Sequence, residues 1–236
     1  RFIKIAAVAA ASTTGAASVA HAAPRRVRLT RHRLAWPGRA RLRVAHLTDL
    51  HVGWGTPERL LEQSVRLCRR ARPDLVVLTG DYVNRSRKYL PAFTRLLRRL
   101  PRPCVATLGN HDHWSGADEV QRAMEQQGVI VLRNASARLR IGSSVIPIVG
   151  VDDGFTRHDD VKKAFSGLSC PEAALVLTHF PETAEKIASC GGRVVLEVDP
   201  VARLASLDLR DRGPNRSRRA VPELSRQPLH VAEREH

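Results

Sequence analysis

Aromatic residues are scarce in this chain, because Phe, Trp and Tyr together make up 4% of its 236 residues. Lysine is also rare, with 5 Lys among the 39 basic residues. The hydrophobic fraction of 43% nevertheless allows a sizeable core in a single domain. That core must therefore be built from Val, Leu, Ile and Ala.

Acidic residues are too few to balance the Arg content, which leaves a formal net charge of +16. A basic surface can attract phosphate backbones or anionic lipid. We interpret the charge mainly as a solvated Arg-rich surface and expect no specific nucleic-acid partner, while contact with an anionic membrane surface stays open. A nuclease guided by the basic segments is a third hypothesis, which the salt dependence of DNA binding would test.

Paired cysteine spacing of the kind that binds metal is absent, since the four cysteines lie far apart, at Cys68, Cys104, Cys170 and Cys190. We interpret Cys68 and Cys104 as small buried hydrophobic residues. Cys170 and Cys190 are candidates for a disulfide, which an exported protein permits, but the sequence does not decide it.

A confident membrane span is also absent, because the N-terminal apolar run over residues 5–19 is short and diluted by Ser, Thr and Gly. Arg1 and Lys4 precede the run, and Ala-His-Ala follows at 20–22, as in an export signal. The opening Arg-Phe-Ile-Lys resembles the end of a twin-arginine signal. We expect an N-terminally truncated signal peptide over 1–22, a basic linker over 23–40, and a protein exported to the cell envelope or the extracellular space.

Apolar segments alternate with amphipathic ones from about residue 41 onward. Predicted strands at 41–47, 74–80 and 104–109 precede predicted helices at 57–70, 91–100 and 117–127. Apolar strands that alternate with helices indicate an α/β sheet covered on both faces. Closer-spaced segments between 129 and 151 predict an antiparallel portion, and further strands are predicted at 173–180 and 193–198.

Polar side chains that can bind metals or move protons follow four of these strands. Taken alone each group is weak evidence, because Asp and His in a loop are usually solvated. Ligands collect at the carboxyl ends of strands in sheets of this type, so the shared position makes the groups strong together. They are Asp49 and His51, then Asp81, then Asn110, His111, Asp112 and His113, and finally His179.

The order Asp-x-His, Gly-Asp, Gly-Asn-His-Asp and a later His, over roughly 42–196, resembles the calcineurin-like metallophosphoesterases. The segments PDLVVLTGDYV and LTHFPE resemble an exported bacterial branch that acts on phosphodiesters. The resemblance implies a metallophosphoesterase-type sandwich of mixed β-sheets flanked by helices, with the domain over 41–198. It also implies a hydrolase that acts on a phosphodiester or phosphomonoester.

The same resemblance implies that the site binds two divalent ions. Mn, Zn and Fe all accept carboxylate and imidazole ligands. Their bridging hydroxide would attack the phosphoryl group. Asp49 and His51 would bind the first ion, Asn110 and His179 would bind the second, and Asp81 would bridge both.

The remaining residues of the third motif have catalytic roles in the resemblance. His111 would be the general acid for the leaving oxygen, and Asp112 would orient it. His113 would lie on the substrate side of the loop, with a simple surface residue as the equal alternative.

The last motif of the family, Gly-His-x-His, is absent from its expected place after residue 198, because no His lies between His179 and His230. Two metal ligands, one for each ion, are therefore missing. We expect the domain to be C-terminally incomplete and its activity to be impaired. The Arg- and Pro-rich segment 199–236 predicts a disordered tail, or the product of a frameshift near the codon for Leu196.

A non-catalytic relative that binds a phosphorylated ligand or a partner protein is the alternative hypothesis. Five of the seven expected ligands are present together with His111, which favours the enzyme. The substrate, the metal and the oligomeric state are not determined by the sequence.

Overall fold

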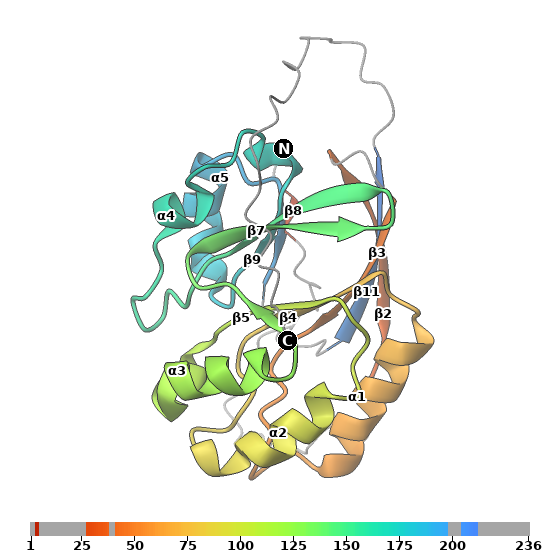
Figure 1. Ribbon diagram of the computed structural model, residues 1–236, viewed down its shortest axis with the longest axis vertical. Coiled ribbons are helices and arrows are strands. Elements are labelled where there is room, and N and C mark those ends of the chain that lie inside the picture. The colour runs from red at the N-terminus through yellow and green to blue at the C-terminus, as the bar shows by residue number, and fades with distance from the viewer. Residues whose placement is uncertain (1–2, 5–26, 38–40, 198–203, 212–236) are drawn as a thin grey trace, which may run out of the picture.

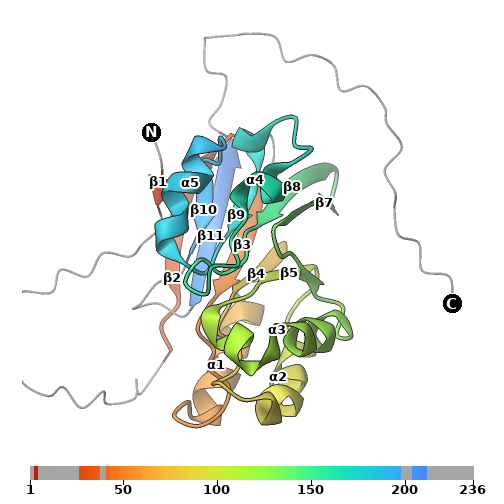
Figure 2. The ribbon, with the colours of Figure 1, turned by 90° about the vertical axis from the view of Figure 1, so that its left-hand side faces the viewer.

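The computed structural model describes residues 3–4, 27–37, 41–197 and 204–211, which form two β-sheets with helices on their outer sides. Figure 1 shows the sheets packed against each other, and Figure 2 shows the same layers from the side. One cluster of buried apolar side chains fills the space between the sheets, including Val44, Val77, Ile148 and Leu177. A second cluster lies between the larger sheet and its helices, and a third lies between the smaller sheet and its helices. The fold is therefore an α/β sandwich of two mixed sheets flanked by helices, which confirms what the family resemblance implies.

The larger sheet has six strands in the order β2-β11-β3-β4-β5-β6. Strands β3 to β6 are parallel, and β11 pairs antiparallel with β3 and parallel with β2. Their bounds are Thr30–Trp36 (β2), Leu42–Leu47 (β3), Leu75–Thr79 (β4), Cys104–Thr107 (β5), Ile130–Val131 (β6) and Leu204–Asp211 (β11).

The smaller sheet has five strands in the order β1-β10-β9-β8-β7. Strands β7 and β8 form an antiparallel hairpin, and the other pairs are parallel. Their bounds are Ile3–Lys4 (β1), Ala135–Ile141 (β7), Ser144–Gly150 (β8), Leu175–Leu177 (β9) and Val194–Leu196 (β10).

Helices cover the outer face of each sheet with their apolar sides. In α1, the buried residues Leu61, Val65 and Cys68 recur at helical spacing. Helices α1, α2 and α3 lie against the larger sheet, whereas α4 and α5 lie against the smaller one (Figure 2). Their bounds are Glu58–Arg70 (α1), Leu90–Leu97 (α2), Asn110–Glu125 (α3), Val161–Phe165 (α4) and Ala184–Ser189 (α5). Short 3₁₀ turns occupy Arg87–Tyr89, Pro171–Ala173 and Pro181–Thr183.

Helix α3 begins earlier than the predicted segment 117–127. It begins at Asn110, and its regular geometry is interrupted at Gly116, where φ is 100°. The Asp112 carboxylate accepts a hydrogen bond from the Gly109 N–H at 2.9 Å, which caps the first turn. Apolar periodicity does not predict this first turn, because its residues, Asn-His-Asp-His, are all polar.

Two segments that we predict to be irregular contain strands instead. Strand β2 lies in the basic linker 23–40, and β11 lies in the tail 199–236. Leu207 and Leu209 of β11 are fully buried, whereas Arg210 is exposed, so the period of two is present. The high Arg and Pro content of the surrounding sequence conceals this alternation, and pairing with strands on both sides stabilises it.

The predicted export signal over 1–22 lies outside the described residues, apart from Ile3 and Lys4, which form β1. Within the parts of the chain that the structure covers, no helix is long and apolar enough to cross a membrane. Cys68 and Cys104 are buried, as predicted, and burial raises the pKa of both thiols to about 12. Cys170 and Cys190 are half-buried and both are free thiols, so the candidate disulfide is not formed.

The assignment of β11 can be tested by removing a side chain from its buried face. Leu207→Ala should lower the free energy of unfolding by about 2–5 kcal/mol, because it leaves a cavity between the sheets. Urea denaturation measures this change. The control Arg210→Ala, on the exposed face of the same strand, should leave it close to the wild-type value. Equal, small effects of both substitutions would show that this segment is not a core strand.

Candidate metal centre

Five of the predicted metal ligands lie together where the two sheets meet. Asp49 and His51 follow β3, Asp81 follows β4, Asn110 follows β5, and His179 follows β9 of the opposite sheet. The carboxyl ends of these parallel strands meet at one edge, as expected for a ligand site in an α/β sheet. The face-to-face packing of the sheets adds His179 to a group that the larger sheet otherwise supplies.

The Asp81 carboxylate lies at the middle of this group. Its Oδ2 is 3.4 Å from His51 Nε2, which is also 3.4 Å from Asp49 Oδ1. Its Oδ1 is 3.4 Å from His179 Nε2, which is 3.1 Å from Asn110 Oδ1. Each oxygen of one buried carboxylate therefore faces a different imidazole.

His111 faces the same carboxylate from the first turn of α3. Its Nε2 lies 4.0 Å from Asp81 Oδ2, and its ring centroid lies 4.5 Å from that of His51. Its Nδ1 is buried without a hydrogen-bond partner. The described residues contain two groups whose ligand atoms lie within 4.8 Å of one another: His51, Asp81 and His111, and Asp49, Asp81 and His179.

The backbone is strained where three of these side chains are attached. Asp49, His51 and Asp81 have φ values of 52°, 42° and 56°, in the left-handed region that non-glycine residues rarely adopt. Hydrogen bonds between the two loops hold this conformation: the Asp49 N–H donates to the Gly80 carbonyl at 3.2 Å, and the His51 N–H donates to the Asp81 carbonyl at 2.8 Å. The strain turns three side chains toward one point.

Gly80 and Gly109 allow the loops after β4 and β5 to approach closely. A Cβ atom on Gly80 would lie 2.5 Å from the Gly109 backbone nitrogen, and one on Gly109 would lie 2.5 Å from Asp81 Oδ1. Both distances are far shorter than any tolerated contact. The glycines of the Gly-Asp and Gly-Asn-His-Asp motifs are therefore required by the packing of the site.

Asp112 connects these loops, which differs from the role expected for it. One carboxylate oxygen accepts from the Asp81 N–H at 2.8 Å and the Gly109 N–H at 2.9 Å, and the other accepts from the Tyr82 N–H at 2.9 Å. Both oxygens are thus occupied by backbone donors, and Asp112 does not hydrogen-bond the His111 ring. Burial raises the pKa of Asp112 to about 7, and the Asp81 carboxylate adds to this rise.

His179 is held in a fixed orientation by the backbone of β4. Its Nδ1–H donates to the Thr79 carbonyl at 2.7 Å, so that Nε2 points at Asp81 and Asn110. Burial lowers the pKa of His179, but hydrogen bonding and charge attraction to Asp81 reverse this effect and raise the pKa to about 9. In the absence of metal, His179 and Asp81 therefore form an ion pair at neutral pH.

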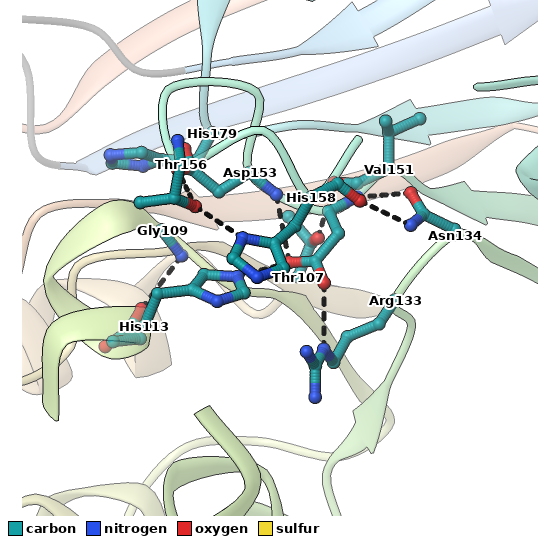
Figure 3. Close-up of polar contacts among 12 residues, drawn as sticks. Thr107, Gly109, His113, Arg133, Asn134, Val151, Asp153, Thr156, His158 and His179 are labelled. Carbon is teal, nitrogen blue, oxygen red and sulfur yellow. Dashed lines mark hydrogen bonds and ion pairs between the residues drawn. The ribbon is translucent and has the colours of Figure 1, made fainter. Parts of the chain in front are cut away.

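His113 lies beside the centre and faces a different set of partners. Its Nε2–H donates to Asp152 Oδ1 at 2.8 Å, and its ring stacks on His158 with 4.0 Å between centroids. Arg133 Nε donates to the other oxygen of Asp152 at 2.8 Å (Figure 3). Asp152 and His158 were not predicted from the sequence, although Asp152 lies two residues beyond the buried end of β8.

The donors of this centre suit divalent cations. Carboxylate, amide oxygen and imidazole nitrogen are ligands that Mn, Zn and Fe accept. The strained backbone, the glycine contacts and the His179 orientation all serve to bring these atoms together. The Asp81 carboxylate is buried and that of Asp49 is partly buried, so bound cations would offset the cost of holding their charges near each other.

Comparisons with known proteins agree with this geometry. A family model described as calcineurin-like phosphoesterase matches residues 42–198, which is more than half of the chain. An uncharacterised metallophosphoesterase of Bacillus subtilis, YkoQ, is 31% identical over 155 residues, which cover 61% of this chain and 55% of that protein.

Two further relatives have functional names. Phosphodiesterase YaeI of Escherichia coli is 29% identical over 194 residues, which cover 78% of this chain and 70% of that protein. UDP-2,3-diacylglucosamine pyrophosphatase LpxG of Chlamydia trachomatis is 27% identical over 202 residues, which cover 65% of this chain and 61% of that protein. The chain thus spans little more than half of the Bacillus and Chlamydia proteins. The family match over most of the folded region leads to one conclusion: the chain belongs to the calcineurin-like phosphoesterase family.

Proposed function

We propose that the protein is a metal-dependent phosphoesterase that hydrolyses a phosphodiester or a phosphomonoester. The observation that carries this proposal is the position of Asp81, whose two oxygens lie 3.4 Å from His51 Nε2 and 3.4 Å from His179 Nε2. Because each Asp81 oxygen faces a different imidazole, one carboxylate can contribute a ligand atom to each of two ions. Asp49, His51 and Asp81 would hold one ion, and Asp81, Asn110 and His179 would hold the other.

The names of two relatives support this class of reaction. YaeI is named as a phosphodiesterase, and LpxG is named as a pyrophosphatase. Bound divalent ions would activate water and polarise the phosphoryl oxygens. The contribution of the chain itself is to place the ligands, to exclude bulk water from Asp81, and to supply a proton donor.

His111 is the proton donor in this proposal. Burial lowers its pKa, and the Asp81 carboxylate only partly offsets this effect. An anionic phosphate near Nε2 would favour the protonated form, because opposite charges stabilise each other at short range. The ring packs between His51 and Trp114, which would hold Nε2 toward the phosphate.

A non-catalytic phosphate-binding protein is the second candidate, and one observation favours it. The chain has no His between His179 and His230, so two imidazole ligands that the family resemblance implies are lacking. Three side chains with open positions can still hold a catalytic metal. Weak binding of both ions and low activity are therefore part of the proposal.

The role of His111 can be tested with the Mn-loaded protein. His111→Ala should lower kcat for bis(4-nitrophenyl) phosphate by about 10²–10⁴, because a general acid contributes this much. The Mn content, measured by atomic emission after equilibrium dialysis against a fixed Mn²⁺ concentration, should stay the same. Loss of metal in parallel with activity would instead identify His111 as a ligand. Tight metal binding by the wild type without any hydrolysis would favour the non-catalytic alternative.

Asp112→Asn, unlike His111→Ala, should lower the Mn content in the same assays. An amide would place an NH₂ group against at least one backbone donor, so a buried N–H would lose its acceptor. The free energy of unfolding should fall by about 1–3 kcal/mol, and Mn content should fall because the Asp81 and Asn110 loops separate. The exposed Asp118→Asn serves as the control and should change neither. Unchanged metal content in Asp112→Asn would show that Asp112 does not position the ligands.

Metal binding should depend on pH through His179. The proton on His179 must leave before Nε2 can bind an ion, so affinity should rise with pH until about 9. Calorimetric titration with Zn²⁺ at pH 7 in two buffers of different ionisation enthalpy should show release of about one proton, which His179→Ala abolishes. In the metal-free protein the raised pKa of His179 stabilises the folded state. This stabilisation is complete below about pH 6.5 and is lost as the pH rises through about 9. Zinc affinity independent of pH between 6 and 9 would contradict this.

A further inference from the structure

Exposed apolar side chains gather around the opening of the metal centre. Among the described residues, three large aromatic side chains are exposed: Trp54 is 83% exposed, Phe155 is 59% exposed and Trp114 is 44% exposed. Each follows a candidate site residue within three positions, namely His51, Asp152 and His111. In a chain with 4% aromatic residues, this concentration at one edge of the sheets is a specific feature.

Trp114, Phe155 and Phe180, here called the aromatic cluster, extend outward from His111. The centroid of the Trp114 ring lies 5.0 Å from that of His111 and 6.0 Å from that of Phe155. Phe155 lies 6.1 Å from Phe180, which directly follows His179. The cluster therefore extends from His111 to the neighbour of His179 and lies along one side of the candidate metal centre.

A cation and a cavity complete the surroundings of Trp114. The guanidinium carbon of Arg85 lies 4.4 Å from the centroid of the indole, a cation–π arrangement. Trp114 also lines a cavity of about 520 Å³, together with His113, Arg133, Thr156 and His158. The indole is thus held in place by Arg85, remains partly exposed, and borders a space large enough for a small organic group.

We propose that the aromatic cluster is a subsite for a flat, apolar group attached to the phosphate, as in an aryl phosphodiester. The proposal rests on the proposed function and names the substrate class of that same site. Burial of aromatic surface against Trp114 and Phe155 stabilises such a ligand. The pKa of His111 is lowered by burial and also by the positive charge of Arg85, which would suit the negative charge of a phosphate beside that ring. A phosphoester with a small polar group gains neither contact.

Exposed aromatics on loops could also contact the surface of a membrane. The position of Trp114 beside His111 favours a ligand within the site over a lipid surface outside it. The two readings predict different results for the same variants, and vesicle binding distinguishes them.

The test compares two phosphonates that have similar charge and no hydrolysable ester bond. Isothermal titration of the Mn-loaded protein should show phenylphosphonate binding about tenfold tighter than methylphosphonate, the value expected for one aromatic contact. Trp114→Ala and Phe155→Ala should bring this ratio close to one and leave methylphosphonate affinity unchanged. Trp114→Phe should retain most of the ratio, because an aromatic face remains. Val145→Ala, which removes an exposed apolar side chain from the opposite end of β8, should leave the ratio as in the wild type.

The outcomes separate this proposal from the proposed function. If methylphosphonate binds but the ratio stays the same in Trp114→Ala and Phe155→Ala, the subsite proposal is wrong and the phosphoesterase proposal stands. If neither phosphonate binds the Mn-loaded protein, both are wrong. If the ratio is unchanged while Trp114→Ala abolishes binding to phosphatidylglycerol vesicles, the cluster contacts a membrane surface and the subsite proposal is also wrong.

Discussion

A single buried carboxylate, that of Asp81, is the interaction on which the site depends. Its side chain is shielded from water, and its two oxygens face the imidazoles of His51 and His179 at 3.4 Å each. A buried negative charge is costly unless positive groups compensate it. In the metal-free protein the protonated His179 provides this compensation, and this is why its pKa rises to about 9. Divalent cations in the same place would provide it when bound.

The architecture of the whole sandwich serves to deliver the partners of Asp81. Parallel strands β3, β4 and β5 bring their carboxyl ends to one edge, and β9 of the opposite sheet brings His179 to the same place. Gly80 and Gly109 let the loops meet, while Asp112 joins them through three backbone N–H groups. The aromatic cluster lies beside His111 and reaches Phe180, the neighbour of His179, so that apolar surface borders the candidate ligands.

The regular parts of the fold and the metal ligands follow closely from sequence patterns. A continuous apolar strand such as β4, buried at all five positions, is easily recognised, and so is the polar motif after it. Strands β2 and β11 were not predicted, because their alternation lies within Arg-rich sequence whose composition resembles disorder. The start of α3 was also not predicted, since polar residues that cap a helix give no apolar period.

The sequence by itself determined which residues gather at the candidate metal centre, because metal ligands need particular atoms and the strand ends place them at one edge. It did not determine what each side chain contacts. Asp112 bonds backbone N–H groups instead of the His111 ring, and His113 pairs with Asp152, because these contacts join loops that are 30 to 39 residues apart in the chain. Only the packing of the two sheets brings such loops together, so the tertiary structure alone decided these roles and the position of Trp114 beside His111.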